Sequence, residues 1–191
     1  MNTNINQAVE TLKHGGIVIF PTDTAFGIGC KIDNEKAVLK LFEIRKRPKD
    51  KAVPILVSSI RMVERYVGKI NPDVLKLMKK YWPGGLTIIL PCNDNVPFLV
   101  RGGGKTIGIR IPKHKTIYAI IKKLGVPILA PSANFSGNKT AFVFSDLDKR
   151  LVGLVDFVMA GRCTIKKTST VIDCTKKPFK ILRKGAVEIS I

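Results

Sequence analysis

The sequence is poor in the residues that metal centres and redox sites use. It holds only two histidines, His14 and His114, which stand far apart in the chain. A histidine-based catalytic triad therefore has little support. The cysteines lack the paired CxxC spacing of zinc and redox motifs, so we expect reduced, mostly buried thiols. They are Cys30, Cys92, Cys163 and Cys174.

Long apolar runs, internal repeats and low-complexity tracts are also missing. No run reaches the roughly 20 residues that cross a bilayer, and residues 1–16 resemble an amphipathic helix more than a signal peptide. No linker divides the 191 residues, of which 45% are hydrophobic. The sequence therefore predicts one soluble, cytoplasmic domain over 1–191, with no membrane partner.

Acidic residues are scarce compared with basic ones. The chain has 33 lysines and arginines against 14 aspartates and glutamates, a formal net charge of +19. Residues 1–100 carry 15 basic and 9 acidic side chains, whereas 101–191 carry 18 and 5. Such a charge attracts polyanions, including nucleotide triphosphates and the RNA backbone. A basic, solvated surface without a ligand is the alternative, and charge alone does not decide between them.

Hydrophobic periodicity and capping residues predict alternating helices and buried strands. Asp33 or Asn34, Ser58 or Ser59, and Asn71 are the expected N-caps of three of the helices. Helices are predicted over 5–14, 35–45, 60–67, 71–82, 114–124 and 145–152, and strands over 17–20, 53–57, 86–90, 106–112, 126–130, 155–160, 170–174 and 179–183. This order predicts an α/β fold with a twisted mixed sheet flanked by helices.

The stretch "RGGGKT" (101–106) resembles the end of a phosphate-binding P-loop. That motif needs an earlier glycine where Leu99 stands, and it lies between a strand and a helix. Here a turn precedes the stretch and an alternating, strand-like segment follows it. We therefore interpret it as a glycine turn between extended segments.

Polar residues gather in four segments that adjoin predicted strands. They are "PTDTAFG" (21–27), "RKRPKDK" (45–51), "APSANFSG" (130–137), and "TSTVID" (168–173) taken with "ILRKG" (181–185). Each alone fits an ordinary turn, a solvated helix end or a surface ion pair. Ser132 lies in no G-x-S-x-G elbow and has no neighbouring histidine, which favours binding over acylation. Together the segments indicate an anion-binding site at strand ends.

The same segments resemble one known family in order and approximate spacing. The matching motifs, which run from about residue 8 to 187, are "IVIFPTDTAFGIGC", "IRKRPKDKAVPILV", "YWPGGLTIIL", "TIGIRIP", "PILAPSANFSG", "TSTVIDC" and "ILRKGAV". They resemble the YrdC-like threonylcarbamoyl-AMP synthases, called TsaC in bacteria. The resemblance implies a YrdC-like fold with a concave basic cavity. It also implies an enzyme that makes threonylcarbamoyl-adenylate and pyrophosphate from L-threonine, bicarbonate and ATP.

The resemblance implies roles for particular residues of this chain. L-threonine would be held by Thr24, Arg110, the backbone at Ala130, and Ser169. ATP would be held by Arg45, Lys46, Arg47, Thr106, Ser132, Asn134, Thr140 and Arg183, of which Arg45, Arg47, Ser132 and Asn134 would carry catalysis. The chain departs from the family pattern at Arg45, which stands in place of a lysine, and at Phe26, where tyrosine is frequent.

The family's ATP chemistry also implies Mg²⁺. No dedicated carboxylate cluster is visible, and Asp23 and Asp50 are the candidate ligands. Downstream partners implied by the resemblance are tRNA and the proteins that modify it with threonylcarbamoyladenosine.

Two other functions share these features. A noncatalytic protein that binds double-stranded RNA or tRNA could use the same basic cavity. Carbamoyl transfer in hydrogenase maturation shares the fold, but the acylphosphatase and zinc-finger segments that accompany it are absent from this sequence.

Overall fold

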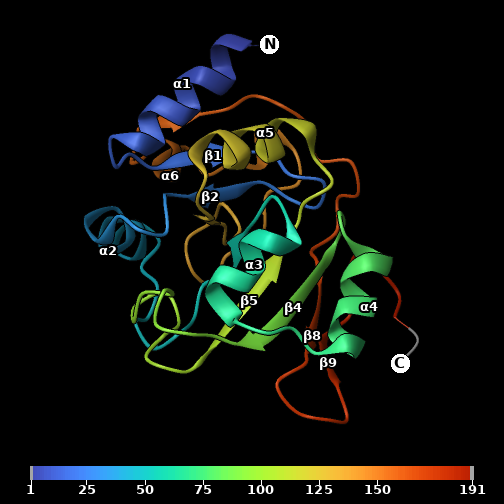
Figure 1. Cartoon of the computed structure of the whole chain (residues 1–191). Helices are drawn as coiled ribbons and strands as arrows, with labels where there is room; N and C mark the ends of the chain where they lie inside the picture. The colour runs from blue at the N-terminus through green and yellow to red at the C-terminus, as the bar shows by residue number, and fades with distance from the viewer. Residues whose placement is uncertain (1, 190–191) are drawn as a thin grey trace.

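The computed structural model describes residues 2–189 (Figure 1). Its helices are α1 (Asn2–Lys13), α2 (Glu35–Ile44), α3 (Ile60–Val67), α4 (Pro72–Tyr81), α5 (Lys115–Leu124) and α6 (Lys149–Val152), with a 3₁₀ helix η1 (Phe144–Asp146). Its strands are β1 (Val18–Phe20), β2 (Gly27–Gly29), β3 (Ile55–Leu56), β4 (Leu86–Pro91), β5 (Thr106–Arg110), β6 (Ile128–Leu129), β7 (Phe157–Val158), β8 (Thr170–Asp173) and β9 (Lys180–Arg183).

Side-chain caps fix where three helices begin. The Asn34 side chain accepts a hydrogen bond from the Ala37 N–H at 2.9 Å, and Ser59 accepts one from the Met62 N–H at 3.1 Å. Asn71 caps α4 in the same way. Each cap satisfies a backbone donor that the first helical turn would otherwise leave unpaired. These predicted helix starts are confirmed.

The strands form two sheets that contain both parallel and antiparallel pairs. The larger sheet has the order β6-β3-β5-β4-β8-β9, and the smaller has the order β2-β1-β7. In the larger sheet β3 runs parallel to β5 and β4 parallel to β8, while the pairs β3–β6, β4–β5 and β8–β9 are antiparallel. The predicted mixed α/β architecture is confirmed.

Backbone hydrogen bonds join the two sheets between β2 and β6. The Ile28 N–H donates to the Pro131 carbonyl at 3.0 Å, and the Leu129 N–H donates to the Cys30 carbonyl at 2.9 Å. The segments after β1 and β6 therefore meet, although more than 100 residues separate them in the sequence. This seam brings the threonine-rich segment 21–27 next to residues 130–137.

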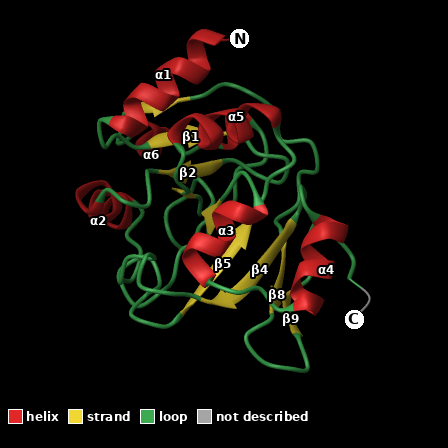
Figure 2. Cartoon of the chain, viewed as in Figure 1, coloured by secondary structure: helices red, strands yellow, loops and turns green. Residues whose placement is uncertain are grey.

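Helices cover the sheets as separate groups. Figure 1 shows α3 and α4 on the near face of the larger sheet, whereas α1, α5 and α6 lie around the smaller one. Figure 2 shows the strands in the interior, with helices and loops around them. The strand side chains Ile19, Ile28, Ile55 and Ile109 have no solvent exposure. Their burial is the main source of stability for the strand framework that carries the polar loops.

Two predicted helices needed correction, and one strand was missed. The first helix begins at Asn2 rather than at residue 5. The helix expected over 145–152 is divided into η1 and α6 because Asp148 caps a new helix, its Oδ1 accepting from the Arg150 N–H at 2.9 Å. Strand β2 was not predicted, since its sequence "GIG" has low strand propensity and pairing with β1 creates it.

The "RGGGKT" stretch closes a loop and leads into β5. Residues 92–105, yellow-green at the lower left of Figure 1, form successive turns. Gly102 and Gly103 have φ angles of 59° and 75°, a region that glycine adopts without strain. A Cβ on Gly102 would also lie 2.6 Å from the Ala52 nitrogen. The interpretation as a glycine turn is confirmed.

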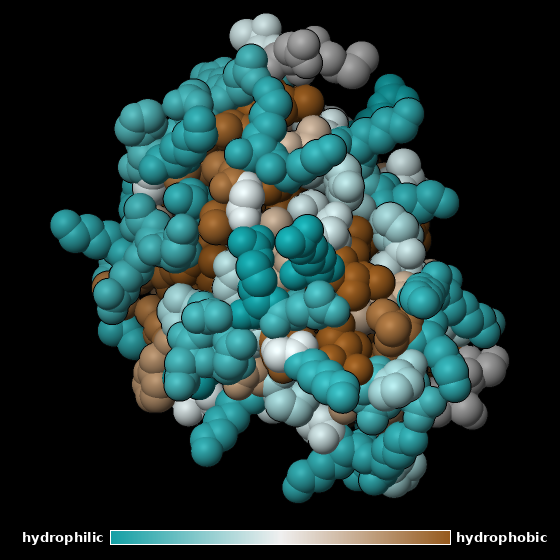
Figure 3. All heavy atoms as spheres, in the orientation of Figure 1, coloured by the Kyte–Doolittle hydropathy of each residue, from teal (hydrophilic) through white to brown (hydrophobic). Residues whose placement is uncertain are grey.

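Long hydrophilic side chains project over much of the face seen in Figure 3, and apolar atoms show between them.

Within residues 2–189, no helix combines the length and the apolar character that crossing a bilayer requires.

Candidate active site

A cavity of about 230 Å³ lies where several strands begin or end. Its lining combines arginines and hydroxyl groups, and none of the described residues that line it is acidic. The lining residues are Thr22, Thr24, Ala25, Phe26, Gly27, Arg45, Arg47, Pro54, Leu56, Thr87, Arg110, Ala130, Pro131, Ser132, Thr140, Thr168, Ser169 and Arg183. We call this the central cavity. Four guanidinium groups make it a site for anions.

The loop after β1 is shaped by the hydroxyl of Thr22. Thr22 Oγ1 donates to the Ala25 carbonyl at 2.7 Å and lies 3.2 Å from the backbone nitrogens of Thr24 and Ala25. It also lies 3.1 Å from Thr24 Oγ1. This compact turn, buried in the protein, directs the Thr24 side chain to the central cavity. The simple turn considered from the sequence is present, and it forms a wall of the cavity.

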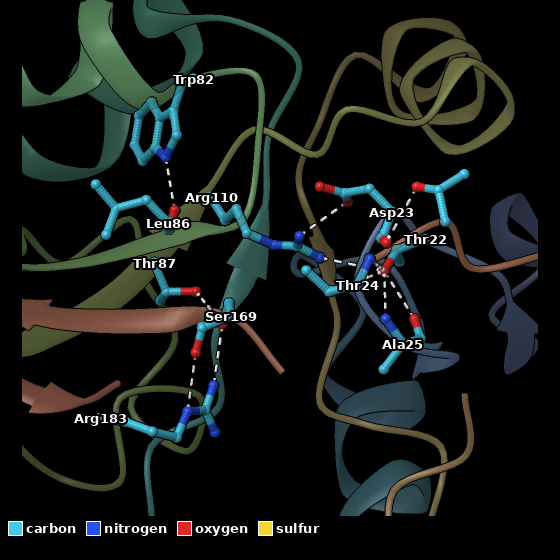
Figure 4. A network of polar contacts seen from close by, with 11 residues as sticks. Thr22, Asp23, Thr24, Ala25, Trp82, Leu86, Thr87, Arg110, Ser169 and Arg183 are labelled. Carbon is cyan, nitrogen blue, oxygen red and sulfur yellow. Dashed lines mark hydrogen bonds and ion pairs between the residues drawn. The ribbon is translucent and has the colours of Figure 1, made fainter. Parts of the chain in front are cut away.

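Arg110, at the end of β5, is held by the same loop (Figure 4). Its Nη1 donates to Asp23 Oδ1 at 2.9 Å, and its Nη2 lies 3.4 Å from Thr22 Oγ1. Both members of the ion pair are buried. Burial lowers the pKa of the Arg110 guanidinium, and the Asp23 carboxylate opposes this effect by favouring the charged form.

Arg45, at the end of α2, is held by an amide instead of a carboxylate. Its Nε donates to the Asn134 carbonyl at 3.1 Å and its Nη2 donates to Asn134 Oδ1 at 3.0 Å. Ser132 Oγ donates to the same Oδ1 at 2.8 Å. Burial, followed by repulsion from Arg47, lowers the pKa of Arg45 to about 10, so the group stays cationic at neutral pH. Its Nη1 is buried and has no partner among the described residues.

The turn that ends α2 brings Arg47 to the cavity as well. The Lys46 N–H donates to the Glu43 carbonyl and the Arg47 N–H donates to the Phe42 carbonyl, both at 2.9 Å. This is the Schellman pattern of helix ends, and Lys46 takes its left-handed position with φ 50°. Arg47 Nε then donates to the Lys51 carbonyl at 3.1 Å. Burial lowers the pKa of Arg47.

The fourth arginine of the cavity is fixed by Ser169 (Figure 4). Arg183, at the end of β9, donates from Nε to the Ser169 carbonyl at 2.9 Å and from Nη2 to Ser169 Oγ at 3.0 Å. Ser169 Oγ also lies 2.9 Å from Thr87 Oγ1. Burial lowers the pKa of Arg183. These three residues line both the central cavity and a neighbouring cavity of about 240 Å³ that contains Thr106.

The structure brings together most of the residues chosen from the sequence. The central cavity is lined by Thr24, Arg45, Arg47, Arg110, Ala130, Ser132, Thr140, Ser169 and Arg183. Asn134 stands behind Arg45, and Thr106 lies in the neighbouring cavity. Lys46 lies elsewhere, in a groove where its Nζ is 5.9 Å from the centre of the Phe135 ring.

Three hydroxyl residues of the cavity were not assigned a role from the sequence, and Asp23 was assigned a different one. Thr22, Thr87 and Thr168 line the central cavity, and Asp23 holds Arg110. Thr22 and Thr168 lie within segments that the sequence did single out, and Thr87 lies within the matching motif "YWPGGLTIIL", so their positions beside strand ends were the available signal. Phe26, at the position where tyrosine is frequent, lines the cavity and packs edge-on against Phe144 with centroids 6.1 Å apart.

The carboxylates proposed for Mg²⁺ do not form a metal site. Asp23 is paired with Arg110, and Asp50 is exposed and does not line the central cavity. Within residues 2–189 no group of three or more histidine, cysteine, aspartate or glutamate side chains is placed to hold an ion. Mg²⁺ prefers several oxygen ligands, including carboxylates. The residues present do not fit a magnesium ion held by the protein.

A protein-family model of the Sua5, YciO and YrdC proteins, described as "Telomere recombination", matches residues 10–185. The chain belongs to this family. A threonylcarbamoyl-AMP synthase of Bacillus subtilis is 38% identical over 188 residues, which cover 96% of this chain and 54% of the relative. The synthase of Aliivibrio fischeri is 34% identical over 158 residues, which cover 81% of this chain and 85% of the relative. The chain thus spans about half the length of the Bacillus relative.

Solved structures of family members have the same fold. The Sua5 protein of Pyrococcus abyssi, in a structure described as complexed with L-threonine, is 34% identical with a TM-score of 0.90. The match covers 95% of this chain and 54% of that one. Escherichia coli YciO is 31% identical with a TM-score of 0.87, and 97% and 90% of the two chains are covered. A HypF structure, at 18% identity and a TM-score of 0.84, shares the fold alone.

Proposed function

We propose that this chain catalyses the formation of threonylcarbamoyl-adenylate and pyrophosphate from L-threonine, bicarbonate and ATP. The observation that carries the proposal is the central cavity, which gathers four arginines and several hydroxyls without an acidic side chain in its lining. Each reactant of the proposed reaction carries an anionic group: the α-carboxylate of threonine, bicarbonate itself, and the phosphates of ATP. The synthase names of curated relatives, including one that this chain covers to 85% of its length, support the same activity.

The end of the cavity near β5 is the proposed site for L-threonine. Arg110 would receive the α-carboxylate, while Thr24 and Ser169 offer hydroxyls and the backbone at Ala130 offers polar groups. The structure of P. abyssi Sua5 described with L-threonine supports a threonine site in this fold. Arg110 and Ser169 adjoin strands of the larger sheet, whereas Thr24 belongs to the loop after β1, so a bound amino acid would be contacted from two sides (Figure 4).

The end of the cavity near α2 is the proposed site for the phosphates of ATP. Arg45 and Arg47 would neutralise the charge, and Ser132 and Thr140 would donate hydrogen bonds. Arg183 would contact the nucleotide from the opposite wall, where the neighbouring cavity with Thr106 begins. Asn134 would act through Arg45, whose guanidinium it holds with two hydrogen bonds. Mg²⁺ would enter with ATP as the metal complex of the substrate.

The proposed reaction forms two bonds in sequence. Bicarbonate takes up a proton and releases water to give CO₂. The neutral amine of threonine attacks the carbon of this CO₂ and releases a proton to solvent, which gives an N-carboxylate. An oxygen of this group attacks the α-phosphorus of ATP, the bond to the bridging oxygen breaks, and pyrophosphate leaves. The protein has to align two anions and neutralise the charge that moves to the leaving group. Arginines and hydroxyls fixed by neighbouring groups are suited to that task.

The product would serve tRNA modification, in which partner proteins transfer the threonylcarbamoyl group to an adenosine. The alternative function is a noncatalytic protein that binds double-stranded RNA or tRNA with the same basic cavity, and its motivation is the net charge of +19. RNA binding through the same basic cavity would depend on the exposed charges, which include Arg183 and most lysines, whereas Arg45 and Arg110 are buried in the cavity. Variants inside the cavity can therefore separate them.

The double variant Arg47→Ala/Asn134→Ala is expected to lose adenylate formation while its affinity for double-stranded RNA changes by less than about twofold, because removing one of many basic charges barely alters the overall field. Pyrophosphate release and RNA binding in a filter assay would be measured on the same preparation. Comparable losses in both measurements would favour the RNA-binding function instead.

A further inference from the structure

We propose that Asp23 is a positioning residue that holds Arg110 against the cavity wall, so that the free edge of its guanidinium faces the carboxylate of a bound α-amino acid. This inference rests on the proposed function and assigns a role to a residue that does not itself line the central cavity. Asp23 would act on threonine binding without touching threonine. Figure 4 shows its side chain directed at Arg110.

The backbone of Asp23 is fixed independently of its side chain. Its carbonyl accepts a hydrogen bond from the Ile165 N–H at 2.8 Å and one from Thr164 Oγ1 at 3.3 Å. Asp23 is 1% exposed. The backbone that carries the carboxylate is therefore held by the segment that leads to Ser169. An anchored carboxylate restricts the orientations of the arginine that it binds.

The two most buried arginines of the cavity are held by different chemistry. Arg45 is held by the neutral amide of Asn134, whereas Arg110 is held by the charged Asp23. Arg183 repels Arg110, and Asp23 offsets that repulsion. The Arg110 end of the cavity thus has a smaller excess of positive charge than the Arg45 end.

This difference in charge matches the two substrates. A polyphosphate carries only negative charge, whereas an α-amino acid enters with an ammonium group beside its carboxylate. A fully compensated arginine can bind the carboxylate while repelling the ammonium less strongly. The arrangement therefore suits an amino acid at the Arg110 end and phosphate groups at the Arg45 end.

The second carboxylate oxygen of Asp23 is the atom that a substitution can change to test the role of the charge. Oδ2 is buried and has no hydrogen-bond partner among the described residues, so only Oδ1 contacts Arg110. Asp23→Asn can keep an oxygen acceptor for Arg110 and the shape of the side chain while removing the charge. It should therefore loosen Arg110 without opening a hole in the core.

Asp23→Asn is expected to raise the dissociation constant and the KM for L-threonine about tenfold, because a charge-assisted hydrogen bond becomes a neutral one. The KM for ATP is expected to change less than about twofold, since Arg45 and Arg47 keep their partners. Threonine binding would be measured by calorimetry, and both KM values by pyrophosphate release. Asp23→Glu, measured in parallel, keeps the charge but moves the carboxylate, and is also expected to weaken threonine binding selectively.

The matched control is Asp156→Asn. Asp156 accepts from the Ile17 N–H at 2.7 Å and pairs with Lys40 at 3.0 Å, but it does not line the central cavity. Its variant is expected to lose stability and keep threonine affinity. Unchanged threonine binding in both Asp23 variants, equal losses for threonine and ATP, or a threonine loss in the control would overturn the inference.

Calorimetric threonine binding and pyrophosphate release also distinguish failure of this inference from failure of the proposed function. Threonine binding by the unsubstituted protein without pyrophosphate release would reject the synthase reaction, and calorimetry on the variants would still decide the role of Asp23. Absence of threonine binding by the unsubstituted protein would overturn the inference itself. Pyrophosphate release with unchanged threonine constants in the variants would overturn only the role of Asp23.

Discussion

Arg45→Ala is expected to lower the rate of pyrophosphate release by about 10²–10³-fold, the effect typical of removing one preorganised donor from developing negative charge. Arg45 is buried and cationic, and its Nη1 has no partner among residues 2–189. An anion in the central cavity would complete its hydrogen bonding. The variant would be assayed for pyrophosphate release with all three substrates present.

The melting temperature of Arg45→Ala is expected to change much less than its activity. Loss of the two hydrogen bonds to Asn134 and the space left by the side chain lower the stability, whereas removal of a buried charge without a carboxylate partner opposes this effect, so the melting temperature is expected to fall only modestly. Arg61→Ala, at an exposed position of α3, is the control and should keep full activity. Retention of activity by Arg45→Ala, or a loss explained by unfolding, would contradict a direct role for this guanidinium.

Arg45→Lys addresses the departure of this chain from the family's lysine. A lysine keeps the charge but cannot donate in a planar fork to both the carbonyl and Oδ1 of Asn134, as Arg45 does. The network with Asn134 therefore indicates that the surroundings of this chain are adapted to arginine. Arg45→Lys is expected to lower the rate of pyrophosphate release about tenfold, a smaller loss than that of Arg45→Ala.

Gly29→Ala is expected to destabilise the protein by about 3 kcal/mol or more, because the new methyl group would overlap backbone that has nowhere to move. An ideal Cβ on Gly29 would lie 1.8 Å from the carbonyl oxygen of Leu129. Leu129 belongs to β6, which is paired with β3 and joined to β2 at the seam between the sheets. Relief of the overlap would require the seam to open. Urea unfolding of both proteins would measure the effect.

Gly153→Ala is the matched control for that substitution. The nearest heavy atom to a Cβ on Gly153 is 3.6 Å away, and its φ of −70° suits alanine. This variant is expected to be as stable as the unsubstituted protein or slightly more stable. Similar unfolding free energies for the two variants would mean that the backbones of β2 and β6 do not approach as closely as described.

Much of the fold could be predicted because local chemistry and tertiary structure agree. Asn34, Ser59 and Asn71 cap helices as their residue types predict, and the short apolar run at 86–90 forms a largely buried strand. Strand β2 could not be predicted, because a "GIG" sequence gains strand structure only from its partners on either side. Close backbone contact, rather than strand propensity, accounts for Gly29.

The site was predictable as a set of segments but not as a set of contacts. The cations of "RKRPKDK" were expected to converge, and Arg45 and Arg47 do line the cavity. Lys46 stands between the two arginines in the sequence and has the left-handed backbone conformation of the turn that ends α2. Its side chain therefore lies near Phe135 rather than in the central cavity. The pair formed by Asp23 and Arg110 joins residues 87 positions apart, and no local pattern encodes such a pair.

The most direct measurement is pyrophosphate release from ATP by the purified protein, with L-threonine and bicarbonate each supplied or withheld, and with the second product identified by mass spectrometry. The proposed function predicts release that requires both co-substrates and a product with the mass of threonylcarbamoyl-adenylate. Release without threonine, or no turnover by folded protein that binds ATP, would contradict it.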